Sequence, residues 1–330
     1  MQIWRKPSDI PSDVTGTIVT IGVFDGVHKG HKAILAQTVS KAKELGLLPV
    51  ALTFDPHPRT VHQPAAVTHL VTSLSDRLNR LESAGIKAVY VQHYTLEYAS
   101  ISPREFVFDQ LARDLRAKAV VVGQDVRFGA GNSGDGAQLL ELGREAGIAV
   151  TIMDDQRSDT GRRWSSTWVR ELLEKGDVAE AGRVLGRPHR IRGVVEHGFQ
   201  RGRELGFPTA NLSGDDLGEI PADGVYAGWL VRDVPDSRAT EYLPAAISVG
   251  TNPQFDGERR TVEAHVLGRS DLNLYDQPIA IDFISRLRPM VKMDSVEELL
   301  AQMDEDLREA AEVLAVPVPR RIDPAEVTAN

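Results

Sequence analysis

The sequence predicts an α/β domain built on a parallel sheet, followed by an antiparallel β-barrel or sandwich that one long helix closes. Residues 1–186 alternate apolar β-branched runs with helical stretches, which is typical of a parallel sheet covered on both faces. Beyond Pro188, short β-like runs are separated by Gly- and Pro-rich turns, which is typical of antiparallel barrels and sandwiches. The charge changes at the same place: residues 1–186 carry 22 basic and 22 acidic side chains, and residues 187–330 carry 16 and 25.

In the first part, strands and helices alternate along the chain. Apolar runs predict strands at 17–24, 48–54, 86–92, 117–122 and 148–153. Helices are expected at 32–45, 75–84, 103–115 and 137–146, and the third of these begins with the capping box Ser102-Pro103-Arg104-Glu105. Ligands bind beyond the carboxyl ends of the strands in such sheets. The turn at His28 and the loops after Phe54 and Gly123 are therefore expected at the ligand-binding edge.

The second part follows a different pattern. Residues 166–186 predict two short bridging helices, and strands are expected at 190–196, 225–231, 245–249, 261–267 and 279–284. A long helix capped by Ser295 and Glu298 should then pack on the barrel. Its apolar stripe is Val296, Leu299, Leu300, Met303, Leu307, Ala310 and Leu314. The expected domains are 1–186 and 187–316, with a loose tail at 317–330.

The composition excludes several classes of protein. With 330 residues, 42% hydrophobic and 26% charged, the chain has the length and balance of a two-domain soluble globular protein. It contains no cysteine, which excludes disulfides, thiolate zinc sites, iron–sulfur clusters and a cysteine nucleophile. No apolar leader or 18-residue apolar run occurs, so a cytoplasmic location without a membrane partner is expected. A basic nucleic-acid footprint is absent, so no nucleic-acid partner is expected either.

A motif at the first strand-to-helix turn carries most of the functional information. Residues 22–31 read Gly-Val-Phe-Asp-Gly-Val-His-Lys-Gly-His. Backbone N–H groups and the positive end of a helix point outward at such a turn, which makes it an anion site. His28 and His31 are three residues apart and share a face of the first helical turn. This pattern indicates chemistry on a nucleotide phosphate.

Other interpretations of this motif have less support. A histidine at a helix start can be an ordinary surface residue. A His-x-x-His pair can also hold a metal, but no HExxH pattern or evident third ligand follows. Gly22, Gly26 and Gly30 are four residues apart, so they do not form the Gly-x-Gly-x-x-Gly fingerprint of dinucleotide sites. The GxxxxGK[ST] phosphate loop is also absent.

A second group of polar residues lies in the second part. Thr209 and Asn211 are two residues apart, so in an extended segment they point the same way. Two neutral oxygen ligands suit Mg²⁺ that also holds nucleotide phosphates; alternatively, the pair satisfies loop backbone. In the expected strand at 261–267, Glu263 and His265 face outward between apolar residues that face the core. Glu263 is then either a general base for an alcohol or an ordinary solvated strand residue.

A resemblance that extends from Ile3 to about Ala315 rests on eight motifs that occur in order along the chain. In the first part they are Gly22-Val-Phe-Asp-Gly-Val-His-Lys-Gly-His31, Thr53-Phe-Asp-Pro-His-Pro58, Val122-Gly-Gln-Asp-Val-Arg-Phe-Gly129 and Ser165-Ser-Thr-Trp-Val-Arg170. In the second they are Leu205-Gly-Phe-Pro-Thr-Ala-Asn-Leu212, Asp223-Gly-Val-Tyr-Ala227, Gly250-Thr-Asn-Pro253 and Val262-Glu-Ala-His265. Together they resemble the bifunctional riboflavin kinase/FMN adenylyltransferases, the bacterial FAD synthetase family.

The resemblance implies a fold and two reactions. The first domain would be a nucleotidylyltransferase-type, Rossmann-like parallel sheet, and the second a small flavokinase antiparallel β-barrel with a C-terminal helix. The second domain would transfer the ATP γ-phosphoryl group to riboflavin, giving FMN. The first would join AMP from a second ATP to FMN, giving FAD and pyrophosphate. Riboflavin, FMN, FAD and ATP are thus the expected partners, with self-association weak if it occurs.

For adenylyl transfer, the resemblance implies a site that positions two anions, because the FMN phosphate attacks the α-phosphorus of ATP without an enzyme nucleophile. His28 and His31 are the implied catalytic residues. The implied ATP-binding residues are Gly22, Phe24, Asp25, Gly30, Asp125, Arg163, Ser166, Thr167 and Arg170. The implied flavin-binding residues are Pro56, His57, Pro58 and Phe128.

For the kinase reaction, the resemblance implies that Glu263 accepts the alcohol proton. Thr209 and Asn211 would bind Mg²⁺ together with ATP, a metal-plus-base arrangement that suffices for phosphoryl transfer. The implied ATP-binding residues are Gly198, Gly202, Gly206 and Pro208. Mg²⁺ is the expected cofactor, and the flavins are substrate and product rather than prosthetic group.

Three positions depart from the family pattern. Trp164 stands where a small aliphatic residue is usual, Val126 where Phe is commoner, and Asp276 where Gly is expected. None of these removes a proposed reacting group. The sequence leaves two other functions open. An adenylyltransferase for another nucleotide would leave the polar residues of the second domain unused, and a flavin carrier would need none of the reactive groups.

Overall fold

The computed structural model describes residues 1–65, 69–196, 207–214, 217–234, 239–251 and 260–319. The chain divides into two compact units. The first comprises Met1–His69 with Leu74–Ser165, and the second comprises Leu70–Ser73 with Ser166–Asn330.

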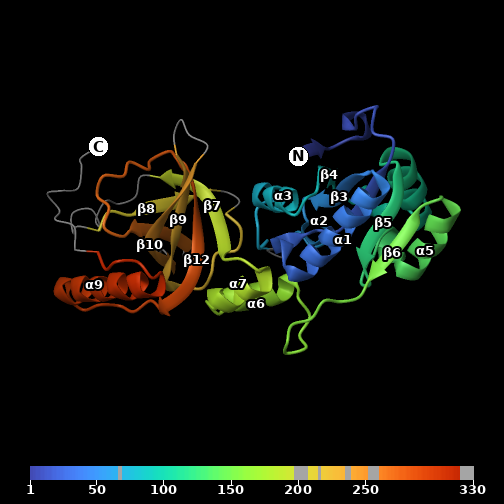
Figure 1. Ribbon diagram of the computed structural model, residues 1–330. Helices are drawn as coiled ribbons and strands as arrows, with labels where there is room; N and C mark the ends of the chain where they lie inside the picture. Colours follow the sequence, from blue (N-terminus) through green and yellow to red (C-terminus); the bar gives the residue numbers. More distant parts are fainter. Residues whose placement is uncertain (66–68, 197–206, 215–216, 235–238, 252–259, 320–330) are drawn as a thin grey trace. The chain divides into compact units, whose positions relative to one another are not determined.

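Within the described residues of the first unit, strands and helices alternate as predicted (Figure 1). The strands are β1 (Gln2–Trp4), β2 (Thr17–Ile21), β3 (Leu48–Asp55), β4 (Ala88–His93), β5 (Ala117–Gly123) and β6 (Ala149–Met153). The α-helices are α1 (Lys29–Leu45), α2 (Pro58–His62), α3 (Leu74–Ser83), α4 (Pro103–Glu105) and α5 (Gly136–Glu145). The remaining helical turns are η1 (Pro7–Asp9), η2 (Asp25–Val27), η3 (Tyr98–Ser100), η4 (Phe106–Asp114) and η5 (Ala130–Asn132).

These strands form one parallel sheet in the order β1-β4-β3-β2-β5-β6. The five strands expected from the sequence are confirmed, and β1 adds an edge strand that pairs with β4. The chain order reverses beside β2, because β3 and β4 lie on one side of it and β5 and β6 on the other. The carboxyl ends of β2 and β5 therefore frame the point at which such sheets bind ligands.

Several expected element boundaries differ from the structure, and two of the differences have a clear local cause. β2 ends at Ile21 rather than at Phe24, because Phe24 has a φ of 54° and a left-handed residue cannot continue a strand. The helix expected at 103–115 begins as α4, but Phe106–Asp114 is π-helical. There the N–H of Leu115 bonds the carbonyl of Gln110, five residues back.

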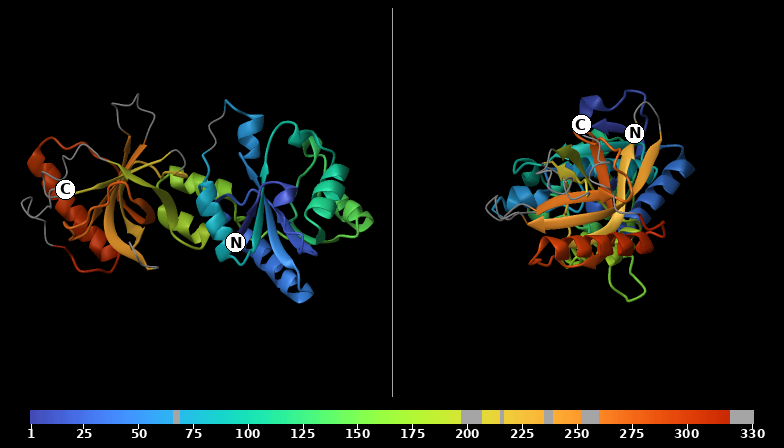
Figure 2. Two further views of the ribbon diagram at one scale, coloured as in Figure 1. Left: turned by 90° about the horizontal axis from the view of Figure 1, so that it is seen from above. Right: turned by 90° about the vertical axis from the view of Figure 1, so that its left-hand side faces the viewer.

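Both faces of the sheet are covered. Successive side chains of a strand point to opposite faces, and those of β3 pack against helices on both sides. In β3, Val50 and Leu52 pack in the cluster that contains Leu111 of η4. Ala51, between them, packs in the cluster that contains Leu35 of α1. The views in Figure 2 show helices on both sides of the twisted sheet.

The second unit is built on a closed barrel. It begins with α6 (Ser166–Glu174) and α7 (Val178–Leu185), the two short helices predicted. The strands are β7 (His189–Glu196), β8 (Ala210–Ser213), β9 (Gly224–Asp233), β10 (Thr240–Thr251), β11 (Arg260–Val266) and β12 (Pro278–Arg288). They pair antiparallel in the cyclic order β10-β11-β8-β7-β12-β9. The sequence pattern was compatible with either a barrel or a sandwich. Because the strand pairings form a closed ring, the architecture is a barrel.

The long helix α9 (Val296–Val313) packs on the barrel as predicted. Leu307, Ala310 and Leu314 are buried in one cluster with Phe207. The predicted stripe is wrong at Val296, which is 54% exposed, because the first turn of α9 lies outside this cluster. The guanidinium of Arg288 on β12 anchors the helix by pairing with both carboxylate oxygens of Asp306, each at 2.7 Å.

Candidate active sites

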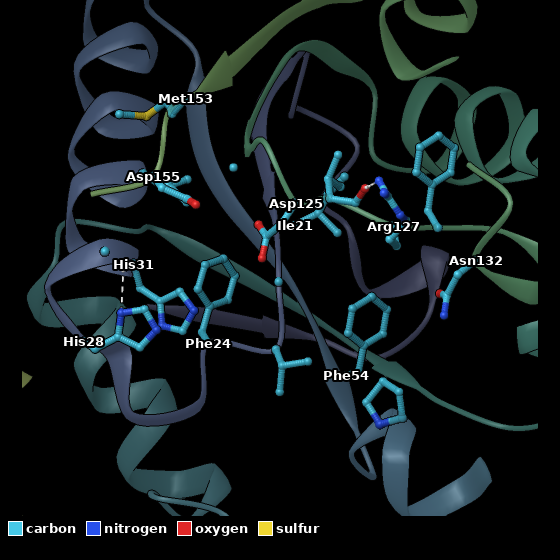
Figure 3. Close-up of a pocket in the computed structure, with 18 of the residues that line it drawn as sticks. Ile21, Phe24, His28, His31, Phe54, Asp125, Arg127, Asn132, Met153 and Asp155 are labelled. Atoms are coloured by element: carbon cyan, nitrogen blue, oxygen red, sulfur yellow. Dashed lines mark hydrogen bonds between the residues drawn. The ribbon is translucent and has the colours of Figure 1, made fainter. Parts of the chain in front are cut away.

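A pocket of about 380 Å³ lies at the carboxyl edge of the sheet, a volume within the range of small-molecule sites. In Figure 3, His28, His31 and Phe24 group on one side of this pocket, with Asp125 and Phe54 across from them. Nine residues of the sequence-based prediction line it: Gly22, Phe24, His28, Gly30, His31, Pro58, Asp125, Phe128 and Arg163.

The turn that carries the histidines is held in an unusual backbone conformation. Phe24 and Val27 both have positive φ, 54° and 42°, which costs free energy for residues with side chains and must be maintained by neighbouring contacts. The carbonyl of Val23 supplies such contacts, because it accepts hydrogen bonds from the Thr53 hydroxyl at 3.0 Å and from the buried Arg77 guanidinium at 2.8 Å. A Cβ at Gly22 would lie 3.1 Å from the Phe24 ring, so this position also has little room for a side chain.

His28 and His31 form a stacked pair at the start of α1. Their ring centroids are 3.7 Å apart with 22° between the planes, and Phe24 meets His31 edge-on at 5.3 Å. His28 is the N-cap: its Nδ1 accepts the backbone N–H of His31 at 3.4 Å. Since Nδ1 accepts, the hydrogen of a neutral His28 ring lies on Nε2. Gly30 makes room for this ring, because a Cβ there would lie 3.1 Å from it.

His31 is neutral near pH 7. Burial, and then the nearby charges of His28 and Arg163, hold the pKa of His31 well below its ordinary value. Its Nδ1 is buried without a hydrogen-bond partner among the described residues. A neutral imidazole can donate a hydrogen bond to a phosphate oxygen but brings no charge. The positive charge in the pocket therefore has to come from other groups.

Arg163 provides such a charge, between two carboxylates. Its Nη2 pairs with Asp125, and its Nε lies 3.1 Å from Asp155 Oδ1. Asp155, missed by the sequence-based prediction, is the more buried of the two acids and also lines the pocket. The prediction gave Asp125 and Arg163 separate contacts with the nucleotide, whereas here they bond each other. An incoming phosphate would compete with the exposed Asp125 for the guanidinium.

The other end of the pocket is aromatic. Phe54 and Tyr94 pack edge to face at 5.7 Å, and Tyr94 and Tyr98 at 5.6 Å. The Tyr98 hydroxyl donates to Gln110 Oε1, whose amide donates to Gln92. Burial raises the pKa of Tyr98, so this hydroxyl keeps its proton. These rings give this end of the pocket an apolar lining, which suits an aromatic ligand.

Not every predicted residue lies at this pocket. Pro56, His57 and the buried Asp25 are not among its lining residues, and His57 Nδ1 caps α2 by accepting the Arg59 N–H at 3.0 Å. Of the family departures, Val126 and Trp164 line the pocket. Three further predicted residues are in the second unit, on α6: Ser166, Thr167 and Arg170.

The second predicted site lies where β8 meets β11. Asn211 stands opposite Glu263 in the antiparallel pairing. The Thr209 hydroxyl donates to Glu263 Oε2 at 3.2 Å, and the Asn211 amide lies 3.5 Å from that hydroxyl. The barrel thus brings together a hydroxyl, an amide and a carboxylate from two segments of the chain. Gly198, Gly202 and Gly206 lie outside the described residues.

The oxygens of this second site fit Mg²⁺, which prefers hard oxygen ligands and commonly uses one or two carboxylates with substrate phosphates. In the part of the chain that the structure describes, no three His, Cys, Asp or Glu side chains are gathered as a metal site. The group around Glu263 offers a single carboxylate, so the ion would need the ATP phosphates as further ligands.

His265 lacks the solvent exposure expected of an outward-facing strand residue. Alternation along β11 predicts that it faces outward with Glu263, yet it is only 5% exposed. Phe207 covers it with ring centroids 5.5 Å apart, and its Nδ1 lies 2.9 Å from the carbonyl oxygen of Pro208. Pro208, predicted as an ATP contact, is thus also the backbone partner of this histidine.

The comparisons with known proteins match both units. Residues 10–168 match the family model for FAD synthetase and residues 185–314 that for riboflavin kinase. A protein of Escherichia coli (strain K12) named bifunctional riboflavin kinase/FMN adenylyltransferase is 33% identical over 304 residues, which cover 92% of this chain and 95% of the relative. One of the same name from Bacillus subtilis (strain 168) is 32% identical over 304 residues, which cover 91% and 93%.

The chain belongs to the bifunctional riboflavin kinase/FMN adenylyltransferase family. It carries an FAD synthetase domain on the sheet, where the pocket lies, and a riboflavin kinase domain on the barrel, where Thr209, Asn211 and Glu263 meet.

A solved structure shares the family fold over nearly the whole chain. It is described as the crystal structure of a macrolide-efflux protein from Streptococcus pneumoniae, and it aligns with a TM-score of 0.83 and 30% identity over 93% of this chain and 97% of that one. The efflux name is that protein's own. Among the described residues here, every helix is too short or too polar to cross a bilayer.

Several lining residues of the FAD synthetase pocket were missed from the sequence. Phe54, Tyr94, Tyr98 and Asp155 are examples. A signal was available, because Phe54 lies at the end of β3, Tyr94 and Tyr98 lie in the segment after β4, and Asp155 lies just after β6, at the edge where ligands bind. Aromatic residues at that position would have indicated a platform for a flat ring.

Proposed function

We propose that this chain phosphorylates riboflavin at the barrel site and adenylylates the resulting FMN in the pocket of the sheet unit. The observation that carries the proposal is the meeting of Thr209 and Glu263, 54 residues apart in the chain, at 3.2 Å. A hydroxyl and a carboxylate so placed suit phosphoryl transfer, which needs a base beside the metal ligands. The relatives from Escherichia coli and Bacillus subtilis are named for the same two activities.

In the kinase reaction, Glu263 accepts the proton of the riboflavin 5′-hydroxyl as its oxygen attacks the γ-phosphorus of ATP, and ADP leaves. Thr209, Asn211 and the ATP phosphates would hold Mg²⁺, which would neutralise phosphate charge. Phosphoryl transfer gains mostly from positioning and charge neutralisation. The Thr209–Glu263 bond keeps the carboxylate oriented in the absence of substrate.

In adenylyl transfer, a phosphate oxygen of FMN attacks the α-phosphorus of a second ATP, and pyrophosphate leaves. The neutral His31 ring and the adjacent His28 ring would donate hydrogen bonds to phosphate oxygens, where charge builds up. Arg163, held through Nε by Asp155, would neutralise the leaving group after exchanging Asp125 for phosphate. Ser166, Thr167 and Arg170 at the start of α6 are kept as further phosphate ligands. Pro58 and Phe128, which line the pocket, are kept as flavin contacts, and Pro56 and His57, which directly precede Pro58, are kept as contacts that the bound flavin would reach.

We further propose that residues 1–186 and 187–316 are the two functional domains, followed by a tail at 317–330. ATP and Mg²⁺ are the proposed ligands. The proposed location is the cytoplasm, with weak self-association at most.

The test is a product assay on the full chain with riboflavin, ATP and Mg²⁺. The wild type should form FMN and FAD. Glu263→Gln should lose FMN formation by about 10²–10⁴-fold but still convert supplied FMN to FAD. His31→Ala should show the reverse. Formation of neither product by the wild type would leave a flavin carrier, and FAD from FMN without FMN from riboflavin would leave an enzyme with one activity.

A further inference from the structure

His265 is a buried titratable residue that the proposed kinase reaction does not use. It stands two residues after Glu263 on β11 and is enclosed beneath Phe207. An imidazole costs free energy to bury unless its polar atoms are bonded. An apolar residue would fill this place without that cost. The presence of a histidine therefore indicates that its hydrogen bond has a role.

That hydrogen bond has a defined direction. His265 Nδ1 lies 2.9 Å from the carbonyl oxygen of Pro208. A carbonyl only accepts, so Nδ1 carries the hydrogen and donates it. Burial lowers the pKa of His265, which keeps the ring neutral near pH 7. The side chain of His265 is therefore a fixed, neutral donor to the backbone of the segment that precedes β8.

The bond lies where the backbone pairing of β8 and β11 stops. The last pair in the register is Ala210 with Ala264. The next step would set Thr209 opposite His265, but no pairing is recorded there, and Pro208 has no N–H to donate. The His265 side chain therefore secures the chain one residue before Thr209, at a point that the strand ladder does not reach.

We propose that His265 is a positioning residue for phosphoryl transfer: it holds the Pro208 carbonyl so that the adjacent Thr209 hydroxyl stays within reach of Glu263. This inference rests on the kinase function proposed above. The Thr209–Glu263 bond is 3.2 Å long, so a shift of about 1 Å in the segment would break it, and displacements of that size can cost about 10²-fold in rate.

Three substitutions separate this role from simple filling of the core. The amide nitrogen of an Asn side chain can take the place of His Nδ1, whereas that of Gln reaches the place of Nε2. His265→Asn should therefore keep the bond to Pro208, and His265→Gln should lose it although it is equally polar. His265→Leu removes the donor and keeps an apolar filling.

The same barrel offers a matched control. His189 on β7 is buried, and its Nε2 donates to the carbonyl of Glu219 at 2.7 Å. Glu196, at the far end of β7, pairs with Asn211, so His189 lies roughly 23 Å away along the strand at about 3.3 Å per residue. His189→Leu removes the same kind of bond at a distance from Thr209.

The assay measures kcat and KM for riboflavin phosphorylation, the Mg²⁺ concentration for half-maximal rate, and thermal unfolding, with conversion of FMN to FAD as an internal control. We expect kcat for FMN formation to fall about 10- to 100-fold in His265→Gln and His265→Leu, with a higher Mg²⁺ requirement, and to stay within about threefold in His265→Asn. His189→Leu should lower the unfolding temperature yet leave kcat for FMN formation unchanged.

Equal kcat values in His265→Asn and His265→Gln would overturn the inference, as would an equal loss in His189→Leu. If His265→Leu does not fold, the comparison of kcat between His265→Asn and His265→Gln still tests the inference. A wild-type chain that forms no FMN would refute the proposed function itself, whereas an active wild type with equal Asn and Gln rates would refute only the role of His265.

Discussion

Gly30→Ala tests whether the stacked histidines of the FAD synthetase pocket must keep their positions. A Cβ at residue 30 would lie 3.1 Å from Cε1 and 3.2 Å from Nδ1 of His28, and 3.4 Å from the Trp164 carbonyl oxygen. Ordinary carbon contacts are about 3.5–4.0 Å, so the His28 ring would have to move by roughly 0.4–0.9 Å. The ring cannot yield freely, because it is buried, stacked on His31 at 3.7 Å and bonded to the His31 N–H.

The expected result is a loss of activity without a loss of stability. If 1 Å of misplacement costs about 10²-fold, Gly30→Ala should lower kcat for FAD synthesis about 10- to 100-fold. Alanine is favoured over glycine in a helix by up to about 1 kcal/mol, which offsets part of the cost of moving the ring, so the free energy of unfolding should change little. The assay follows FAD formation from FMN, and riboflavin phosphorylation by the same chain is the control. A kcat for FAD within twofold of wild type would refute the argument.

Three further predictions concern single groups. Asp276 has a φ of 61°, so Asp276→Gly should raise the free energy of unfolding by about 0.5 kcal/mol; a lower denaturant midpoint would contradict this. Because the pKa of His31 lies below its unfolded value of about 6.5, its contribution to stability should be complete above that pH and lost as pH falls below it. Urea midpoints of the wild type should therefore decline between about pH 6.5 and 5 more steeply than those of His31→Gln. Tyr98→Phe removes the donor to Gln110, which should cost about 1–3 kcal/mol of stability and raise KM for FMN but not for riboflavin in the kinase assay.

Much of the architecture could be predicted because it depends on neighbours in sequence. The alternation of apolar runs indicated the parallel sheet, and the capping box at Ser102 and Glu105 is present, with both side-chain bonds formed. His28 and His31 could be grouped by their spacing of three on one helical turn. Such local spacing is imposed by backbone geometry, whatever the rest of the chain does.

The misplaced boundaries have local causes that composition does not reveal. Phe24 reads as the last apolar residue of a strand, but its left-handed backbone ends β2 early. That conformation is held by Thr53 and Arg77, which bond the carbonyl of Val23 from other elements. Because those bonds come from residues distant in sequence, the residues that surround Phe24 in the sequence do not predict its left-handed conformation.

The local sequence pattern was sufficient to predict the order of the elements, the parallel and antiparallel sheets, and the polar residues that are candidates for catalysis. Closure of the barrel, burial of His265 and the pairing of Arg163 with Asp125 and Asp155 depended on long-range contacts instead. Periodicity specifies which face of an element is apolar, but it does not specify which distant segment covers that face. Only the folded chain decides which side chains meet, and therefore which protons and charges a substrate encounters.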